Sequence, residues 1–238
     1  GYQTALIATS SIVHATPASF YAHVVSRKEY ENIALQMSTS VVDYFIGGGK
    51  KHFNDREDNR NLIKEMSTYD IVSSLSRFDK STASKIGHFT NRDEPNRILD
   101  GRLPLKDAVQ SVLNKFDRDQ KPFFMMVEGS QIDWGGHSNE IEYVISEFND
   151  FDAAIQTVLD YTLKHPNTLV VVTADHETGG LTIPKGDIKK MRPSVEFSTV
   201  GHTASMVPVF AKGPAADTFS GIYDNTLIFN KMLDVLNE

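Results

Sequence analysis

Four segments of this sequence carry the side chains that proteins use to bind divalent cations. Each lies beside a short apolar run, and each combines imidazoles, carboxylates or hydroxyls within a few positions. Imidazole and carboxylate ligands together hold zinc, whereas an all-oxygen set suits magnesium. The segments are His14-Ala-Thr16, Glu128 to His137 with Asp133 between them, Asp175-His176, and Gly201-His202-Thr203.

Taken singly, each segment has a simpler interpretation. An Asp-His pair after a strand is more often a turn whose polar groups are satisfied locally, and the spacing of Asp133 and His137 also fits a helix-entry cap. Taken together they are harder to dismiss, because burying several carboxylates and imidazoles at one place without cations is costly. We therefore expect a divalent-cation site if the fold brings the four segments to one edge.

The elements that position these segments follow from the hydrophobic pattern. Short runs rich in Val, Ile, Phe and Leu alternate with amphipathic stretches, which is typical of buried parallel strands connected by helices. This alternation predicts an α/β fold with a doubly wound, mostly parallel sheet sandwiched by helices, and ligands bind such sheets beyond the carboxyl ends of the strands. The predicted strands are residues 5–8, 41–46, 69–72, 122–128, 169–173 and 207–210.

Four helices are predicted between and after these strands. One begins at Thr16-Pro17, a capping hydroxyl followed by proline at the first helical position, and runs to about Arg27. The others span residues 105–116, 138–165 and 225–236. The polar stretches 50–60 and 184–198 are predicted to be irregular surface loops, and His88 lies in a polar segment where we expect it to be solvated.

Length and composition limit the possible functions. The chain has 238 residues, 40% of them hydrophobic and 23% charged, which suits one domain over residues 1–238 with a short surface insertion at about 184–199. A net charge of −7 argues against a nucleic-acid or anionic-membrane partner. The absence of cysteine excludes disulfides, thiolate nucleophiles and cysteine zinc sites. The apolar runs are too short to cross a bilayer.

In order along the chain, the motifs resemble those of the two-zinc, bacterial type of alkaline phosphatase. Val127-Glu-Gly-Ser-Gln-Ile-Asp-Trp-Gly-Gly-His137 looks like the family's metal-binding motif of Glu, Asp and His, and Val172-Thr-Ala-Asp-His176 resembles its second zinc motif. Gly201-His-Thr203 is similar to the segment with the last zinc histidine. His14-Ala-Thr-Pro-Ala and Ala22-His-Val-Val-Ser-Arg27 resemble the segment that bears the third metal site and the phosphate arginine.

The resemblance implies a role for each matching residue. A first zinc would be bound by Asp133, His137 and His202, and a second by Asp175 and His176. Thr16 and Glu128 would contribute to a third site, which normally holds magnesium. Arg27 would bind two phosphate oxygens with its planar guanidinium. His14 and Trp134 occupy positions where family members differ; we expect His14 to affect the third site's choice of metal, and Trp134 to line the phosphate pocket or to pack.

The resemblance also implies an activity, hydrolysis of phosphate monoesters through a phosphoseryl intermediate, with two zinc ions and one magnesium ion as cofactors. Inorganic phosphate would be a second ligand, the location would be periplasmic or secreted, and a homodimer is expected. The family's nucleophilic serine lies in an upstream Asp-Ser-Ala-like segment, which does not occur in this chain. We therefore expect a C-terminal portion that is weakly active or inactive alone, with unpaired strand edges where the missing N-terminal segment would lie.

Two alternatives remain open from the sequence. One is a superfamily relative such as a phosphodiesterase, mutase or sulfatase; Arg27 favours a monoester dianion, because its guanidinium can bind two non-bridging oxygens. The other is a non-catalytic module that binds metal and phosphate.

Overall fold

The computed structural model describes residues 1–189 and 192–237. The chain forms two compact units: an N-terminal unit of residues 1–131 and 146–154, and a C-terminal unit of residues 132–145 and 155–238. None of the described helices is both long and apolar enough to cross a membrane.

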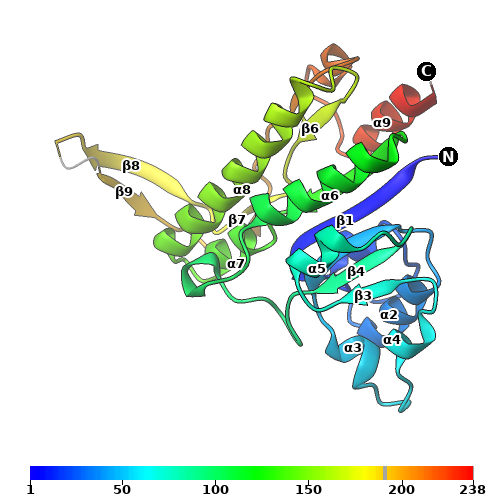
Figure 1. Ribbon diagram of the computed structural model, residues 1–238. Helices are drawn as coiled ribbons and strands as arrows, with labels where there is room; N and C mark the ends of the chain where they lie inside the picture. Colours follow the sequence, from blue (N-terminus) through cyan, green and yellow to red (C-terminus); the bar gives the residue numbers. More distant parts are fainter. Residues whose placement is uncertain (190–191, 238) are drawn as a thin grey trace. The chain divides into compact units, whose positions relative to one another are not determined.

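The N-terminal unit is built on a five-stranded parallel sheet with the strand order β3-β4-β2-β1-β5 (Figure 1). All four pairings are parallel, and β1 lies second from one edge with almost every residue buried. Such continuous apolarity is what a strand covered on both faces requires. The strands are β1 (Gln3–Ser11), β2 (Tyr44–Gly48), β3 (Asp70–Val72), β4 (Ile86–Phe89) and β5 (Phe123–Glu128).

Helices flank this sheet and confirm the predicted α/β class. The longest, α6, buries Val109, Val112 and Phe116 at helical spacing, as the amphipathic pattern predicts. Phe45 of β2 packs against Phe89 of β4, with ring centroids 5.1 Å apart. The helices of this unit are α1 (Ala15–Ala18), α2 (Tyr30–Ser38), α3 (Lys51–Asn54), α4 (Leu62–Glu65), α5 (Leu75–Lys80), the 3₁₀ turn η1 (Ile98–Asp100) and α6 (Leu105–Asp119).

Three predictions for this unit are wrong. The stretch 50–60, predicted to be an irregular surface loop, contains α3 (Lys51–Asn54), whose Phe53 is fully buried. The helix that begins near Thr16 ends at Ala18 and does not reach Arg27. The side-chain amide of Gln36 donates to the carbonyl of His23 (3.0 Å) and accepts from its N–H (2.8 Å), so a tertiary contact replaces the helical hydrogen bonds there. His88 is buried in β4, where its Nδ1 lies 3.1 Å from the carbonyl oxygen of Val72; burial lowers its pKa.

The C-terminal unit contains three short antiparallel strand pairs. β6 (Val170–Val172) pairs with β11 (Phe210–Lys212), β7 (Glu177–Thr178) with β10 (His202–Thr203), and β8 (Thr182–Asp187) with β9 (Arg192–Glu196). The last pair forms a hairpin (Figure 1) that overlaps the stretch 184–198 predicted to be irregular. β8 is exposed along its length. The helical elements are α7 (Gln131–His137), α8 (Ile141–Thr162), η2 (Ala216–Phe219) and α9 (Leu227–Asn237). The first residue of α7 and the middle of α8 belong to the N-terminal unit.

Open strand edges occur in both units. β5 pairs only with β1, and β6 pairs only with β11, among the strands of the described residues. β3 and the other strands of the two-stranded sheets likewise have one partner each among the described residues, so edges left unpaired by a missing N-terminal segment stay a prediction. Exposed edges of this kind can accept a further strand.

Candidate metal centre

Three elements of the C-terminal unit bring Asp133, His137 and His202 together. Asp133 and His137 are four residues apart on α7, a spacing that places both side chains on one face of a helix. His202 belongs to β10, whose partner β7 directly follows Asp175 and His176. The predicted zinc residues thus come from three segments that the fold of this one unit collects.

The ligand atoms of the three residues form a nearly regular triangle. The Nε2 atoms of His137 and His202 are 3.2 Å apart, and they lie 3.4 Å and 3.5 Å respectively from Oδ1 of Asp133. Ligands about 2.0–2.1 Å from a tetrahedral zinc ion lie roughly 3.3–3.4 Å from one another. The spacing and the donor types therefore fit three ligands of one zinc ion.

A backbone carbonyl sets the protonation of one imidazole. Nδ1 of His137 lies 2.6 Å from the carbonyl oxygen of Val200, which can only accept, so Nδ1 carries a proton. In the neutral ring, Nε2 then presents its lone pair to the triangle, as metal-binding histidines do. Two imidazole nitrogens and a carboxylate oxygen facing one point make a cation there favourable.

Asp175 and His176 form a second ligand pair beside the triangle. Nε2 of His176 lies 3.1 Å from Oδ2 of Asp175. The ring of His176 stacks on that of His202 with centroids 3.6 Å apart, so the pair is adjacent to the first three ligands. Asp175 is 73% exposed, which leaves its carboxylate accessible. Two donors can begin a zinc site but do not complete one.

The other predicted site residues lie in the N-terminal unit, except Trp134 on α7. Glu128 ends β5 and pairs in register with Ala8 of β1, while His14 and Thr16 follow the end of β1. These residues therefore lie at the carboxyl ends of adjacent strands, where the predicted third site requires them. Arg27 is exposed and has no hydrogen bond or ion pair with another described residue.

Comparison with known proteins identifies the chain's relatives. A profile described as alkaline phosphatase matches residues 1–190. Alkaline phosphatase 3 of Bacillus subtilis is 33% identical over 317 aligned residues, which cover 99% of this chain and 68% of the relative. The chain belongs to the alkaline phosphatase family. The repressible alkaline phosphatase of Saccharomyces cerevisiae is 35% identical, but the match covers only 39% of its length.

Solved alkaline phosphatases share the fold over almost the whole chain. The enzyme from the Antarctic bacterium TAB5 superimposes with a TM-score of 0.93 at 41% identity, covering 99% of this chain and 72% of that one. A TAB5 variant in which glutamate replaces a histidine, with Mg bound in its M3 site, superimposes with a TM-score of 0.92 at 40% identity. The chain therefore corresponds to part of these longer phosphatases.

The sequence did not reveal the residues that support the family's ligand motifs. The Glu177 carboxylate accepts from the backbone N–H groups of Gly180 (3.1 Å) and Leu181 (3.2 Å) and from the hydroxyl of Thr203. Burial alone would raise the pKa of Glu177, but these hydrogen bonds hold it below its ordinary value. Glu177 is therefore an anionic side chain on β7 that stabilises the pairing of β7 with β10 through its hydrogen bond to Thr203. Its only sequence signal is its position beside His176.

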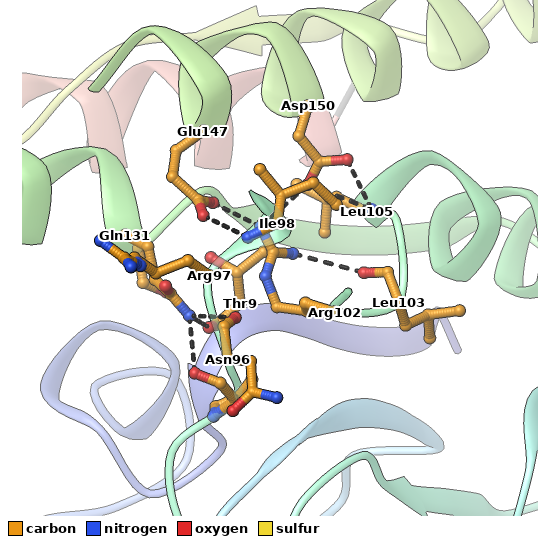
Figure 2. A network of polar contacts seen from close by, with 12 residues as sticks. Thr9, Asn96, Arg97, Ile98, Arg102, Leu103, Leu105, Gln131, Glu147 and Asp150 are labelled. Carbon is orange, nitrogen blue, oxygen red and sulfur yellow. Dashed lines mark hydrogen bonds and ion pairs between the residues drawn. The ribbon is translucent and has the colours of Figure 1, made fainter. Parts of the chain in front are cut away.

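A second support lies where β5 leads into α7. The fully buried Gln131 donates from Nε2 to the carbonyl oxygens of Thr9 (2.8 Å), Pro95 (3.0 Å) and Asn96 (3.1 Å) (Figure 2). One side-chain amide thus ties the family motif to the end of β1 and to the loop before η1. Its acceptors are backbone carbonyls, which no residue pattern identifies.

The same loop is held by buried charges. Arg102 pairs with Glu147 and, at 3.1 Å, with Asp150, both on α8 (Figure 2). The two carboxylates also accept from backbone N–H groups of Ile98 (2.7 Å) and Leu105 (3.1 Å). Two buried carboxylates share one guanidinium; burial raises the pKa of Glu147. The loop around η1 is therefore fixed to this part of α8.

Proposed function

We propose that this chain provides the metal-binding and phosphate-binding residues of a zinc-dependent phosphomonoester hydrolase that acts through a phosphoseryl intermediate. The observation that carries the proposal is the triangle of Asp133, His137 and His202. Its ligand atoms all lie within 4.8 Å of one another. Membership of the alkaline phosphatase family supports phosphate monoesters as the substrate class.

We assign the first zinc ion to that triangle and the second to Asp175 and His176. Bound zinc ions would supply positive charge to the attacking and leaving oxygens and would lower the pKa of a bound water. The stacked rings of His176 and His202 support two neighbouring sites. We assign the third ion, magnesium, to Thr16 and Glu128, whose oxygen donors suit it.

Arg27 is proposed to bind two oxygens of the phosphate. Its planar guanidinium matches two non-bridging oxygens of a monoester dianion, which a lysine ammonium cannot do. Among the described residues this exposed guanidinium has no hydrogen-bond or ion-pair partner, so it can make these bonds. We place Trp134 beside the phosphate, since it lies on α7 next to Asp133. The periplasmic or secreted location and the homodimer remain predictions.

His14 is proposed to set the metal preference of the third site. The TAB5 variant has glutamate in place of a histidine and Mg bound in its M3 site. A carboxylate is a harder ligand than an imidazole and suits magnesium better. The imidazole of His14 would accordingly weaken magnesium binding in this chain.

The test separates phosphate binding from turnover. Zinc-loaded chain is titrated with inorganic phosphate, and Arg27→Lys is expected to bind it roughly tenfold more weakly, about 1.4 kcal/mol. Turnover of para-nitrophenyl phosphate and of bis(para-nitrophenyl) phosphate is then measured with and without an added peptide carrying the family's serine segment. We expect little turnover alone and monoester turnover with the peptide. Phosphate binding that does not depend on zinc, or diester turnover faster than monoester turnover, would contradict the proposal.

A further inference from the structure

Thr178 lies where the two ligand groups meet, and it was not among the residues singled out from the sequence. Its Oγ1 donates to Oδ1 of Asp133 at 2.5 Å and lies 3.2 Å from Nδ1 of His176. We infer that Thr178 is a positioning residue that couples the two proposed zinc sites through this single hydroxyl. The inference rests on the proposed function, because it assigns these residues to zinc.

The direction of the two hydrogen bonds follows from proton counting. A threonine hydroxyl has one proton, and an ionised carboxylate can only accept, so that proton points to Asp133. The hydroxyl oxygen must then accept from Nδ1–H of His176. When zinc binds, Nε2 of His176 can then offer its lone pair on the side of the ring where Oδ2 of Asp175 lies, 3.1 Å away. The hydroxyl therefore orients a ligand of one site and sets the tautomer of a ligand of the other.

The backbone and methyl group of Thr178 also contact the first site's segments. Thr178 pairs in register with His202 across β7 and β10. On its other side it approaches Gly136 of α7 so closely that a Cβ built there would lie 2.8 Å from the Thr178 carbonyl oxygen and 3.0 Å from its Cγ2. One residue thus touches the segments that supply Asp133, His137, His176 and His202.

Two substitutions distinguish the role of the Thr178 hydroxyl from that of the side chain's shape. Thr178→Val keeps the branched side chain and removes both hydrogen bonds, whereas Thr178→Ser keeps the hydroxyl and removes the methyl. Loss of hydrogen bonds to metal ligands typically costs about 10–100-fold in metal affinity. Because the hydroxyl serves both ligand groups, Thr178→Val should weaken both zinc-binding steps, not one.

The experiment titrates zinc into the full chain in competition with a chromophoric chelator. We expect Thr178→Val to bind both zinc ions roughly 10–100-fold more weakly, and Thr178→Ser to stay within about threefold of the wild type. Thr182→Val is the matched control, since this exposed hydroxyl of β8 bonds only a carbonyl oxygen (3.3 Å) among the described residues. The imidazole ¹⁵N spectrum should show His176 protonated at Nδ1 in the wild type and altered in Thr178→Val.

The outcomes distinguish this inference from the proposed function. Wild-type chain that binds no zinc would end both. Zinc binding equal in wild type and folded Thr178→Val would overturn only the inference, as would Thr178→Ser binding as weakly as Thr178→Val. If Thr178→Val does not fold, the ¹⁵N spectrum of the zinc-loaded wild type still decides, because a His176 without a proton on Nδ1 would refute the assigned hydrogen bond.

Discussion

Replacing Gly136 with alanine should damage the metal centre although alanine is the better helix former. A Cβ at this position of α7 would lie 2.8 Å from the carbonyl oxygen of Thr178 and 3.0 Å from its Cβ. Ordinary carbon contacts begin near 3.4 Å, so α7 and β7 would have to separate by roughly 0.6 Å. The rigid carbonyl cannot turn aside as a flexible side chain would.

This displacement is large for a metal site. α7 carries Asp133 and His137, while β7 holds β10 and therefore His202. Separation opens the two edges of the triangle that join His202 to Asp133 and to His137, which now measure 3.5 Å and 3.2 Å. Functional constellations tolerate about 0.5 Å of misplacement. We expect zinc binding to weaken at least tenfold, about 1.4 kcal/mol.

Whether Gly136→Ala raises or lowers the free energy of unfolding tests the same reasoning. Helix propensity alone would make the alanine variant more stable by up to about 1 kcal/mol. Overpacking costs roughly 1–3 kcal/mol, so the balance should be a loss of up to about 2 kcal/mol in urea unfolding. Gly201→Ala is the control: it precedes His202 directly, yet its Cβ would meet only Thr199 Oγ1 at 3.6 Å. A Gly136→Ala chain that binds zinc normally and unfolds at higher urea would refute the argument.

Three further predictions concern the N-terminal unit. Arg102→Met should lower the free energy of unfolding, measured in urea, by about 3–5 kcal/mol, because it leaves two buried carboxylates without their cation. Arg92→Met removes an exposed ion pair and should change that free energy by less than about 1 kcal/mol in the same assay. Burial lowers the pKa of His88 below its unfolded value. The contribution of the buried neutral imidazole to stability is therefore complete above about pH 6.5 and is lost as pH falls toward the folded pKa. His88→Gln should flatten this decline in the free energy of unfolding with falling pH, and an unchanged slope would contradict the role given to His88. His14→Glu should bind magnesium more tightly in calorimetric titration, and unchanged affinity would remove His14 from the third site.

The sequence predicted those parts of the fold that local pattern controls. β1 and β5 follow from continuous apolar runs, and α6 follows from its helical periodicity, because burial of those faces is required wherever the elements pack. The predicted helix end near Arg27 was wrong, since the backbone of His23 bonds the side-chain amide of Gln36, thirteen residues further along the chain. β4 was missed because its central residue is the polar but buried His88.

The residues of the candidate site likewise differ in whether they could be predicted from the sequence. The triangle could be predicted because the segments with Asp133, His137 and His202 resemble the zinc motifs of the alkaline phosphatase family. Thr178 could not, since its hydroxyl meets a carboxylate 45 positions earlier in the chain. Nε2 of Gln131 donates to backbone carbonyls as far as 122 positions away, so its role is visible only in the folded chain. Supporting residues of this kind depend on tertiary geometry.

The central claim is that Asp133, His137 and His202 bind one zinc ion. Crystals of the zinc-loaded chain, measured on both sides of the zinc absorption edge, test it most directly. We predict an anomalous peak inside the triangle, about 2.0–2.1 Å from both Nε2 atoms and at a similar distance from the Asp133 carboxylate. Zinc peaks elsewhere, with none inside the triangle at saturating metal, would contradict the account.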